Sequence, residues 1–322
     1  MTRRFAVVAA GACLSLALGI CHGAPGDYPD KRIRAIVTTP PGGGVDMVAR
    51  LISRELSTSL GQPVVVDNRG GANGVIGVEL AAQAPADGYT LLFIGNNFWA
   101  IPMLKSGVPY DPVADFTPVS LAVRAPNILV VTPSLPVKSV QELIALAKSQ
   151  PGKVNYAAGS AGSTIHLAAE LFKSMAGVDI VYVPYKGAGP AIVDLIAGNV
   201  QMMFGLSVLK HVRAGRLRAL AIATAKPSEL APDLPTVASA GLPGFESAAI
   251  YSVMAKAGTP PEIVARLNRE IVAGLNKPEV RAALFADATE VVASSPQVLA
   301  QTVASEMTKW GAIIKSRGIR AQ

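Results

Sequence analysis

From residue 33 onward, short apolar runs rich in β-branched residues alternate with stretches that have the apolar spacing of helices. Val48, Leu51 and Ile52 illustrate the spacing of three and four positions that places side chains on one helical face. Such alternation builds open, largely parallel sheets whose faces are covered by helices, so it predicts an α/β fold. The predicted strands are 33–38, 64–66, 90–94, 119–123, 128–131, 181–183, 202–204, 219–224 and 251–255.

Helix starts are predicted at Pro260 and Pro278, because proline is tolerated in the first turn of a helix. The segment 296–315 predicts one long amphipathic helix, and we expect Trp310 on its apolar side to be a core residue. No internal repeat or low-complexity segment interrupts this pattern.

The N-terminus has the layout of a secretory signal peptide. Arg3 and Arg4 precede an apolar run, 5–20, that ends in small residues before Gly23. The run is shorter than the roughly 20 residues that a membrane-spanning helix needs. We predict a signal peptide over 1–23 and a periplasmic location. A lipoprotein anchored at Cys21 is the alternative, which the bulky residue before this cysteine disfavours.

Composition limits the classes of function. The two cysteines, Cys13 and Cys21, both lie in the predicted signal peptide, so the mature chain must gain its stability from packing alone. The formal net charge is +7, but the basic residues are scattered, and a nucleic acid is not the expected partner. Two segments, 123–127 and 244–250, are interpreted as crossings between two lobes.

These crossings predict lobe 1 over 24–124 plus 248–322 and lobe 2 over 125–247, with a cleft between the lobes. Ligands of open α/β sheets bind beyond the carboxyl ends of the strands, so we expect the ligand in that cleft. Three turns that lead from strands into helices are the candidates to hold it.

The first turn, 40–46, contains three consecutive glycines, the last two of which are Gly43 and Gly44. Glycine allows the backbone to approach a ligand closely, and the free amides of a first helical turn suit an anion. A tight structural connection is the alternative. We interpret Asp46 as a capping residue or as a partner for a ligand ammonium group.

The second turn, 159–164, supplies the hydroxyls of Ser160, Ser163 and Thr164 at the start of a helix. Hydroxyls and amides at a helix start can form a nest for a carboxylate, although Ser163 or Thr164 could simply cap the helix. Because no nucleophile-elbow motif is present, we expect His166 to pack or to hydrogen-bond to the turn.

The third turn, 185–190, contains Tyr185, Lys186 and Gly187. Lys186 supplies a cation that could contact an anion or remain solvated at the rim of the cleft. The second and third turns, facing the first, would hold an anion between the lobes. The mature chain has only two histidines and no cysteine or suggestive carboxylate pair, so we predict no catalytic residue, metal or cofactor, and no enzyme.

The motifs PGGGVDMVAR, VVVDNRGGANGVIG, YAAGSAGSTIHLAAELF and VPYKGAGPAIVDLIAG occur in this order. On the basis of these motifs, the whole mature chain resembles the tripartite tricarboxylate transporter receptors, often called Bug proteins. The resemblance implies a Venus-flytrap fold of two α/β lobes outside the cytoplasm. It also implies that backbone amides and ordered waters hold one carboxylate of a di- or tricarboxylate, an amino acid or an aromatic acid.

The resemblance also assigns site residues. The near carboxylate should meet Gly43 and Gly44, and the second and third turns should close on it from lobe 2. A cleft loop should contact the far end of the solute through Asn96, Asn97, Phe98 and Trp99.

Three departures from the family pattern concern the pocket, and the third is the pair Phe98 and Trp99, where relatives often have small residues. Gly205 stands where many relatives have a polar or acidic residue, and Tyr251 stands where many have tryptophan. The bulky pair Phe98 and Trp99 predicts an apolar pocket wall for an aromatic or longer aliphatic carboxylate, unless these rings only pack at the rim.

The expected role is that of a monomeric receptor that passes its solute to the membrane permease subunits of a tripartite tricarboxylate transporter. A sensory receptor that presents the solute to a sensor kinase is the alternative. A periplasmic hydrolase is disfavoured by the missing triad motif. The predicted signal peptide and the missing DNA-binding helices exclude the effector domain of a transcription regulator.

Overall fold

The structure is a computed structural model that describes residues 28–159, 162–205 and 208–320. The predicted signal peptide, 1–23, lies outside the described residues. The strands are β1 (Ile33–Val37), β2 (Val64–Asn68), β3 (Thr90–Ile94), β4 (Phe116–Pro126), β5 (Ile128–Val131), β6 (Asn155–Ala158), β7 (Val181–Pro184), β8 (Met202–Gly205), β9 (Arg218–Ile222), β10 (Ala248–Lys256) and β11 (Glu290–Val291). The helices are α1 (Gly44–Leu60), the 3-10 turn η1 (Ala72–Gly74), α2 (Val75–Ala82), α3 (Asn97–Leu104), α4 (Val140–Ser149), α5 (Thr164–Ala176), α6 (Ala188–Ala197), α7 (Leu209–Arg213), α8 (Pro261–Leu275), α9 (Pro278–Ala286) and α10 (Pro296–Arg317).

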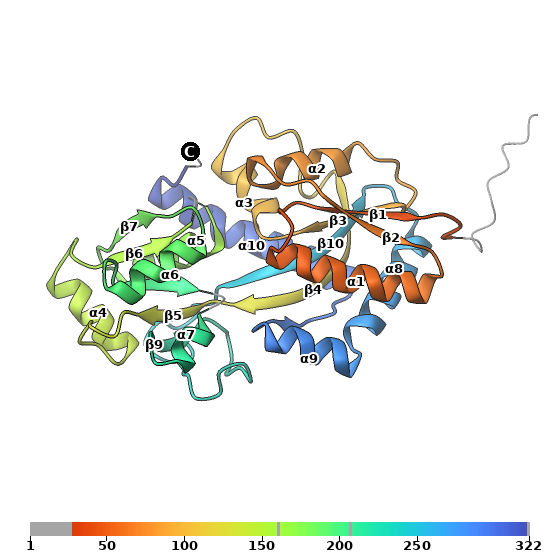
Figure 1. Cartoon of the computed structure of the whole chain (residues 1–322). Coiled ribbons are helices and arrows are strands. Elements are labelled where there is room, and N and C mark those ends of the chain that lie inside the picture. Colours follow the sequence, from red (N-terminus) through yellow and green to blue (C-terminus); the bar gives the residue numbers. More distant parts are fainter. Residues whose placement is uncertain (1–27, 160–161, 206–207, 321–322) are drawn as a thin grey trace, which may run out of the picture.

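Two sheets form the centres of two lobes that lie side by side (Figure 1). The strand order is β11-β4-β10-β3-β1-β2 in the first sheet and β7-β6-β8-β5-β9 in the second. We call the part built on the first sheet lobe 1 and the part built on the second sheet lobe 2. The structure therefore confirms the predicted fold class, an α/β protein with two lobes.

Each sheet is covered by helices on both faces, and the side chains of its strands alternate between these two faces. Ile33, Ala35 and Val37 of β1 pack in one apolar cluster with α1 and α8, whereas Ile36 packs in another with α2, α3 and α10. Because successive side chains of a strand point to opposite faces, a sheet covered on both sides needs apolar residues at nearly every position. Lobe 2 repeats this arrangement, with α4 and α5 on one face of its sheet and α6 on the other.

The sheets are mixed rather than fully parallel. Strand β1 pairs in parallel with β2 and β3, but β10 is antiparallel to both β3 and β4, and β5 is antiparallel to β8 and β9. Strands β4 and β10 are also longer than predicted, and β6 and the short β11 were not predicted. The segment of β6, NYAA, has no β-branched residue, which explains why its sequence gave no strand pattern.

Two buried crossings connect the lobes. The chain passes from β4 to β5 at Asn127 and enters β10 after Ser247. The Asn127 side chain is fully buried, and its Nδ2 donates a hydrogen bond to Oγ of Ser247 at 2.9 Å. The Asn127 amide also donates to the Ser247 carbonyl at 3.1 Å. The crossings are therefore bonded to each other, while the exact lobe boundaries given above stay a prediction.

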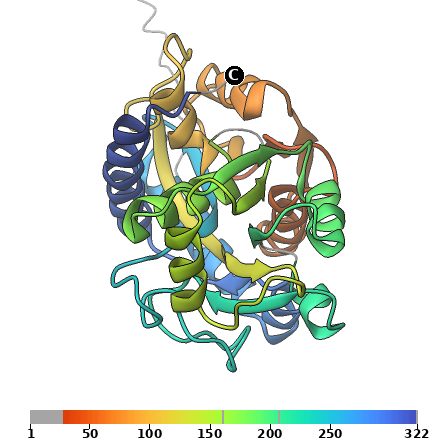
Figure 2. The same cartoon turned by 90° about the vertical axis from the view of Figure 1, so that its left-hand side faces the viewer.

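The C-terminal helix α10 contacts both lobes. Leu299 and Val303 pack on the lobe 1 sheet, whereas Trp310 and Ile314 belong to the apolar cluster of lobe 2. Figure 2 shows α10, in dark blue, along one side of the molecule. The predicted long helix and the core position of Trp310, which is 2% exposed, are confirmed. No helix among the described residues combines the length and apolar character needed to cross a membrane.

Candidate ligand-binding site

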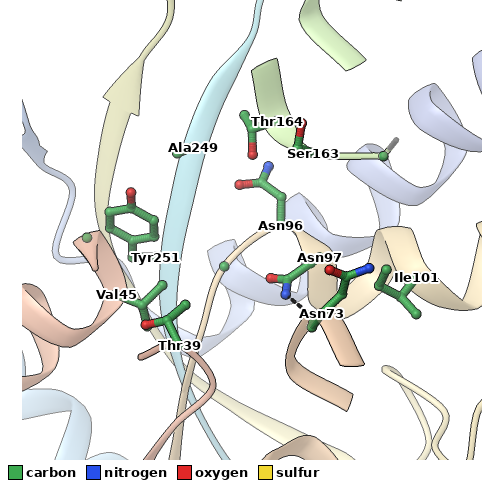
Figure 3. Close-up of a pocket in the computed structure, with 13 residues that line it drawn as sticks. Thr39, Val45, Asn73, Asn96, Asn97, Ile101, Ser163, Thr164, Ala249 and Tyr251 are labelled. Atoms are coloured by element: carbon green, nitrogen blue, oxygen red, sulfur yellow. Dashed lines mark hydrogen bonds between the residues drawn. The ribbon is translucent and has the colours of Figure 1, made fainter. Parts of the chain in front are cut away.

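A cavity of about 270 Å³ lies where the two lobes meet (Figure 3). None of the described residues that line it carries a charged side chain. Lobe 1 contributes Thr39, Gly44, Val45, Asn73, Gly95, Asn96, Asn97, Ile101, Ala249 and Tyr251, and lobe 2 contributes Gly162, Ser163 and Thr164. Recognition in this cavity must therefore use neutral hydrogen-bonding groups and helix dipoles.

The first glycine turn brings the start of α1 to the cavity. Gly43 is the N-cap and provides no side-chain cap, so the first amides of α1, at Gly44 and Val45, have no acceptor within the helix. A Cβ on Gly44 would lie only 2.9 Å from Cζ of Tyr251. Burial raises the pKa of the Tyr251 hydroxyl, which therefore remains protonated and able to donate a hydrogen bond.

Asp46 holds this turn in place from outside the cavity. Its buried carboxylate accepts hydrogen bonds from the Gly42 amide at 2.9 Å, from Arg50 Nε at 3.0 Å and from Asn68 Nδ2 at 2.8 Å. Burial opposes ionisation, but these hydrogen bonds outweigh it and lower the pKa of Asp46. The capping interpretation agrees with this geometry. The structure does not support Asp46 as a ligand contact, because its oxygens are occupied.

The second turn brings the start of α5 to the same cavity. Ser163 is the N-cap, and its Oγ accepts a hydrogen bond from the His166 amide at 3.3 Å, so this serine does cap the helix. Thr164 is the first helical residue, and both side chains line the cavity. Ser160 lies outside the described residues. The N-termini of α1 and α5 thus meet at one cavity from opposite lobes.

His166 supports the second turn and does not line the cavity. It is 4% exposed, its Nδ1 accepts a hydrogen bond from the Gly162 amide at 3.3 Å, and its ring contacts Tyr182 with 4.5 Å between ring centroids. Burial lowers the pKa of His166, so the imidazole is neutral near pH 7. The expectation that His166 bonds to the turn is confirmed, and its role as a direct ligand contact is not supported.

The neutral state of His166 predicts a pH dependence of stability. In the unfolded chain histidine takes up a proton near pH 6.5, whereas the folded protein resists protonation of His166. The free energy of unfolding should therefore fall as the pH drops from 7 to 5.5, by at most about 1.4 kcal/mol per pH unit for this group. Urea unfolding at several pH values should show a smaller decline for His166→Gln than for the wild type. Equal declines would contradict this prediction.

Asn96 and Asn97 line the cavity, but their amides are already bonded. Asn96 Oδ1 accepts a hydrogen bond from the Ile250 amide at 2.7 Å, and its Nδ2 donates to the Ala248 carbonyl at 3.2 Å. Asn97 Nδ2 donates to the carbonyl of Asn73. The two asparagines therefore tie the start of α3 to β10 and to the turn η1.

The structure corrects the prediction for Phe98 and Trp99. Both are fully buried in lobe 1, and neither lines the cavity. The Phe98 ring stacks on Tyr110 at 5.8 Å and meets Phe116 edge-on at 5.2 Å. The predicted apolar pocket wall is therefore wrong for these rings, because both extend from α3 into the apolar core of lobe 1.

The third turn and Gly205 are also absent from the cavity lining. The Tyr185 hydroxyl donates a hydrogen bond to Oδ2 of Asp194 at 2.7 Å. Lys186 is exposed, which agrees with the alternative that it remains solvated at the rim of the cleft. Gly187 is the N-cap of α6. Gly205 ends β8, where a Cβ would meet the Val208 side chain. The structure thus brings the first and second turns together, but not the third.

Seven lining residues were not among the predicted site residues, namely Thr39, Val45, Asn73, Gly95, Ile101, Gly162 and Ala249, although Val45 and Gly162 lie within the first and second predicted turns. Thr39 lies two residues after the end of β1, and its buried Oγ1 has no hydrogen-bond partner among the described residues. The position of Thr39 at the carboxyl end of a parallel strand would have indicated it. The Asn-Gly pair at 73–74 marks a turn, but nothing in the sequence places that turn at the cavity.

Three comparisons with known proteins found proteins that are similar to this chain. Residues 48–319 match the model of a family described as Tripartite tricarboxylate transporter family receptor. The chain is 40% identical to Protein BugT of Bordetella pertussis over 325 residues, which cover 99% of each chain. Among solved structures it is similar to an R. palustris protein with adipate (TM-score 0.79, 40% identity, 91% of this chain and 99% of that one). It is also similar to MatC from Rhodopseudomonas palustris with bound malate (TM-score 0.75, 33% identity, 89% and 100%).

Proposed function

Since the chain belongs to the tripartite tricarboxylate transporter receptor family, we propose that it binds a small carboxylate in the periplasm and delivers it to the permease subunits of such a transporter. The family consists of extracytoplasmic solute-binding receptors rather than enzymes. Removal of residues 1–23 on export is part of the proposal.

The observation that carries the proposal is the convergence of two helix N-termini on one uncharged cavity. The starts of α1 and α5 direct free amides and the positive ends of two helix dipoles toward the space between the lobes. The Tyr251 hydroxyl adds a protonated donor beside Gly44. Together these groups suit a carboxylate, and the adipate and malate found with two similar proteins support the same class.

The size of the cavity favours a small acid. Its volume of about 270 Å³ lies just below the range of roughly 300–1,000 Å³ that is typical of pockets for drug-sized ligands. Because no described lining residue is acidic and the Asp46 carboxylate is occupied, an ammonium group would find no counter-charge there. We therefore expect aliphatic carboxylates to bind better than amino acids of the same length.

A ligand screen tests this function. The protein, purified from the periplasm and refolded to remove any carried ligand, would be screened by thermal shift against mono-, di- and tricarboxylates, amino acids, aromatic acids and neutral sugars. A ligand at one hundred times its Kd adds about 2.7 kcal/mol, which should raise the Tm by several degrees. A shift with one class of carboxylate would support the proposal. The absence of any shift with anions, in protein shown to be folded by circular dichroism, would reject it.

A further inference from the structure

Asn73 adopts a backbone conformation that few residues with a side chain tolerate. Its φ and ψ are 59° and 29°, in the left-handed region, and the preceding Ala72 also has a positive φ of 46°. Among non-glycine residues, asparagine enters this region most readily, so the sequence is compatible with the turn. The conformation places the Asn73 side chain in the lining of the cavity.

Neighbouring groups fix the turn in this position. Asn97 donates a hydrogen bond to the Asn73 carbonyl. Gly74 packs so closely that a Cβ there would lie 2.9 Å from Asn97 Nδ2 and 3.2 Å from the Thr38 Cβ. A shift of the turn would therefore disturb its contacts with Asn97 of α3 and with Thr38, the residue after β1, and these contacts hold the Asn73 side chain at the cavity.

The side-chain amide of Asn73 is available to a ligand. This side chain makes no hydrogen bond with any described residue, whereas Oδ1 and Nδ2 of Asn96 and the Nδ2 of Asn97 are all hydrogen-bonded. In Figure 3 Asn73 lies beside Asn97 and Ile101, on the other side of the cavity from Tyr251. A carboxylate held at the start of α1 would thus leave the far end of its chain near Asn73.

We propose that Asn73 is a specificity-determining residue, whose side-chain amide donates a hydrogen bond to a second carboxylate at the far end of the ligand. This inference rests on the proposed function, because it assumes that the first carboxylate is bound where α1 and α5 meet. Ile101 provides an apolar contact for the methylene groups between the two ends. The ligand is then an aliphatic dicarboxylate rather than a monocarboxylate.

Replacement by glycine tests the side chain without disturbing the turn. Glycine adopts the left-handed conformation readily, and Asn73→Gly keeps the carbonyl that accepts from Asn97. By calorimetry, we expect Asn73→Gly to weaken adipate binding roughly tenfold, as for the loss of a hydrogen bond to a charged group. Binding of hexanoate, which has the same chain length and one carboxylate, should change less than twofold.

A second variant tests the sign of the effect. Asn73→Asp has nearly the same shape but adds a negative charge, so it should weaken adipate binding more than glycine does. Equal Kd values for adipate in the wild type and in Asn73→Gly, or equal losses for adipate and hexanoate, would overturn the inference and leave the proposed function intact. Failure of the wild type to bind any carboxylate would overturn the proposed function itself.

Discussion

The variant Gly44→Ala is expected to lose carboxylate affinity by roughly 30-fold while remaining folded, as for the loss of one hydrogen bond to a charged group. The Cβ of alanine would lie 2.9 Å from Cζ of Tyr251 and closer still to its hydroxyl, so either the tyrosine or the start of α1 must move. Both movements displace groups that we propose to hold the carboxylate. Calorimetric titration with the acid that gives the largest thermal shift would measure the loss.

Two controls separate local displacement from general damage. Gly311→Ala introduces the same methyl group within α10, where its nearest contact is Met103 Sδ at 3.4 Å. This variant should bind normally and be as stable as the wild type or slightly more stable, because alanine favours helices. Adding Tyr251→Ala to Gly44→Ala removes the colliding ring. Because Tyr251→Ala also removes a proposed donor, the double variant is compared with Tyr251→Ala alone. If the collision causes the loss, Gly44→Ala should weaken binding in the wild type but not in the Tyr251→Ala background, and normal binding by Gly44→Ala would reject the α1 site.

The sequence predicted the parts of the fold that depend on local pattern. The strand β1 follows from apolar residues at successive positions such as Ile33, Ala35 and Ile36, and α10 follows from its helical spacing. Strand direction depends on where the chain crosses between the lobes, which no local window contains. For this reason the antiparallel pairing of β10 with β3 and β4 was missed.

The candidate site shows the same division between local and distant causes. The turns at Gly44 and Ser163 were predicted because each joins a strand to a helix start, and helix starts at the carboxyl ends of strands can bind anions. Phe98 was misplaced because its burial depends on Tyr110 and Phe116, two later positions in the chain. Asn73 was missed because only the hydrogen bond from Asn97 and the packing of its turn bring it to the cavity.

The largest expected effect on stability comes from Asp46→Asn. The carboxylate accepts hydrogen bonds from three donors, the Gly42 amide, Arg50 and Asn68, and an asparagine in its place would direct its own NH₂ group at one of them. An unmatched buried donor and a lost ion pair should together cost about 2–4 kcal/mol in the free energy of unfolding. Urea unfolding at pH 7 would measure this change. Asp233→Asn, an exposed aspartate with no ion pair or hydrogen bond among the described residues, should change stability by less than about 0.5 kcal/mol.

Acid should remove the difference between the wild type and Asp46→Asn. Because the pKa of Asp46 is lowered in the folded protein, its contribution is fully present above the pKa of the unfolded chain, about 3.9, and is lost as the pH falls through the lower folded value. The gap between the two unfolding free energies should therefore be constant from pH 7 to about pH 5 and shrink below pH 4. A gap that stays constant down to pH 3 would show that Asp46 stabilises the turn through shape and packing rather than through its charge.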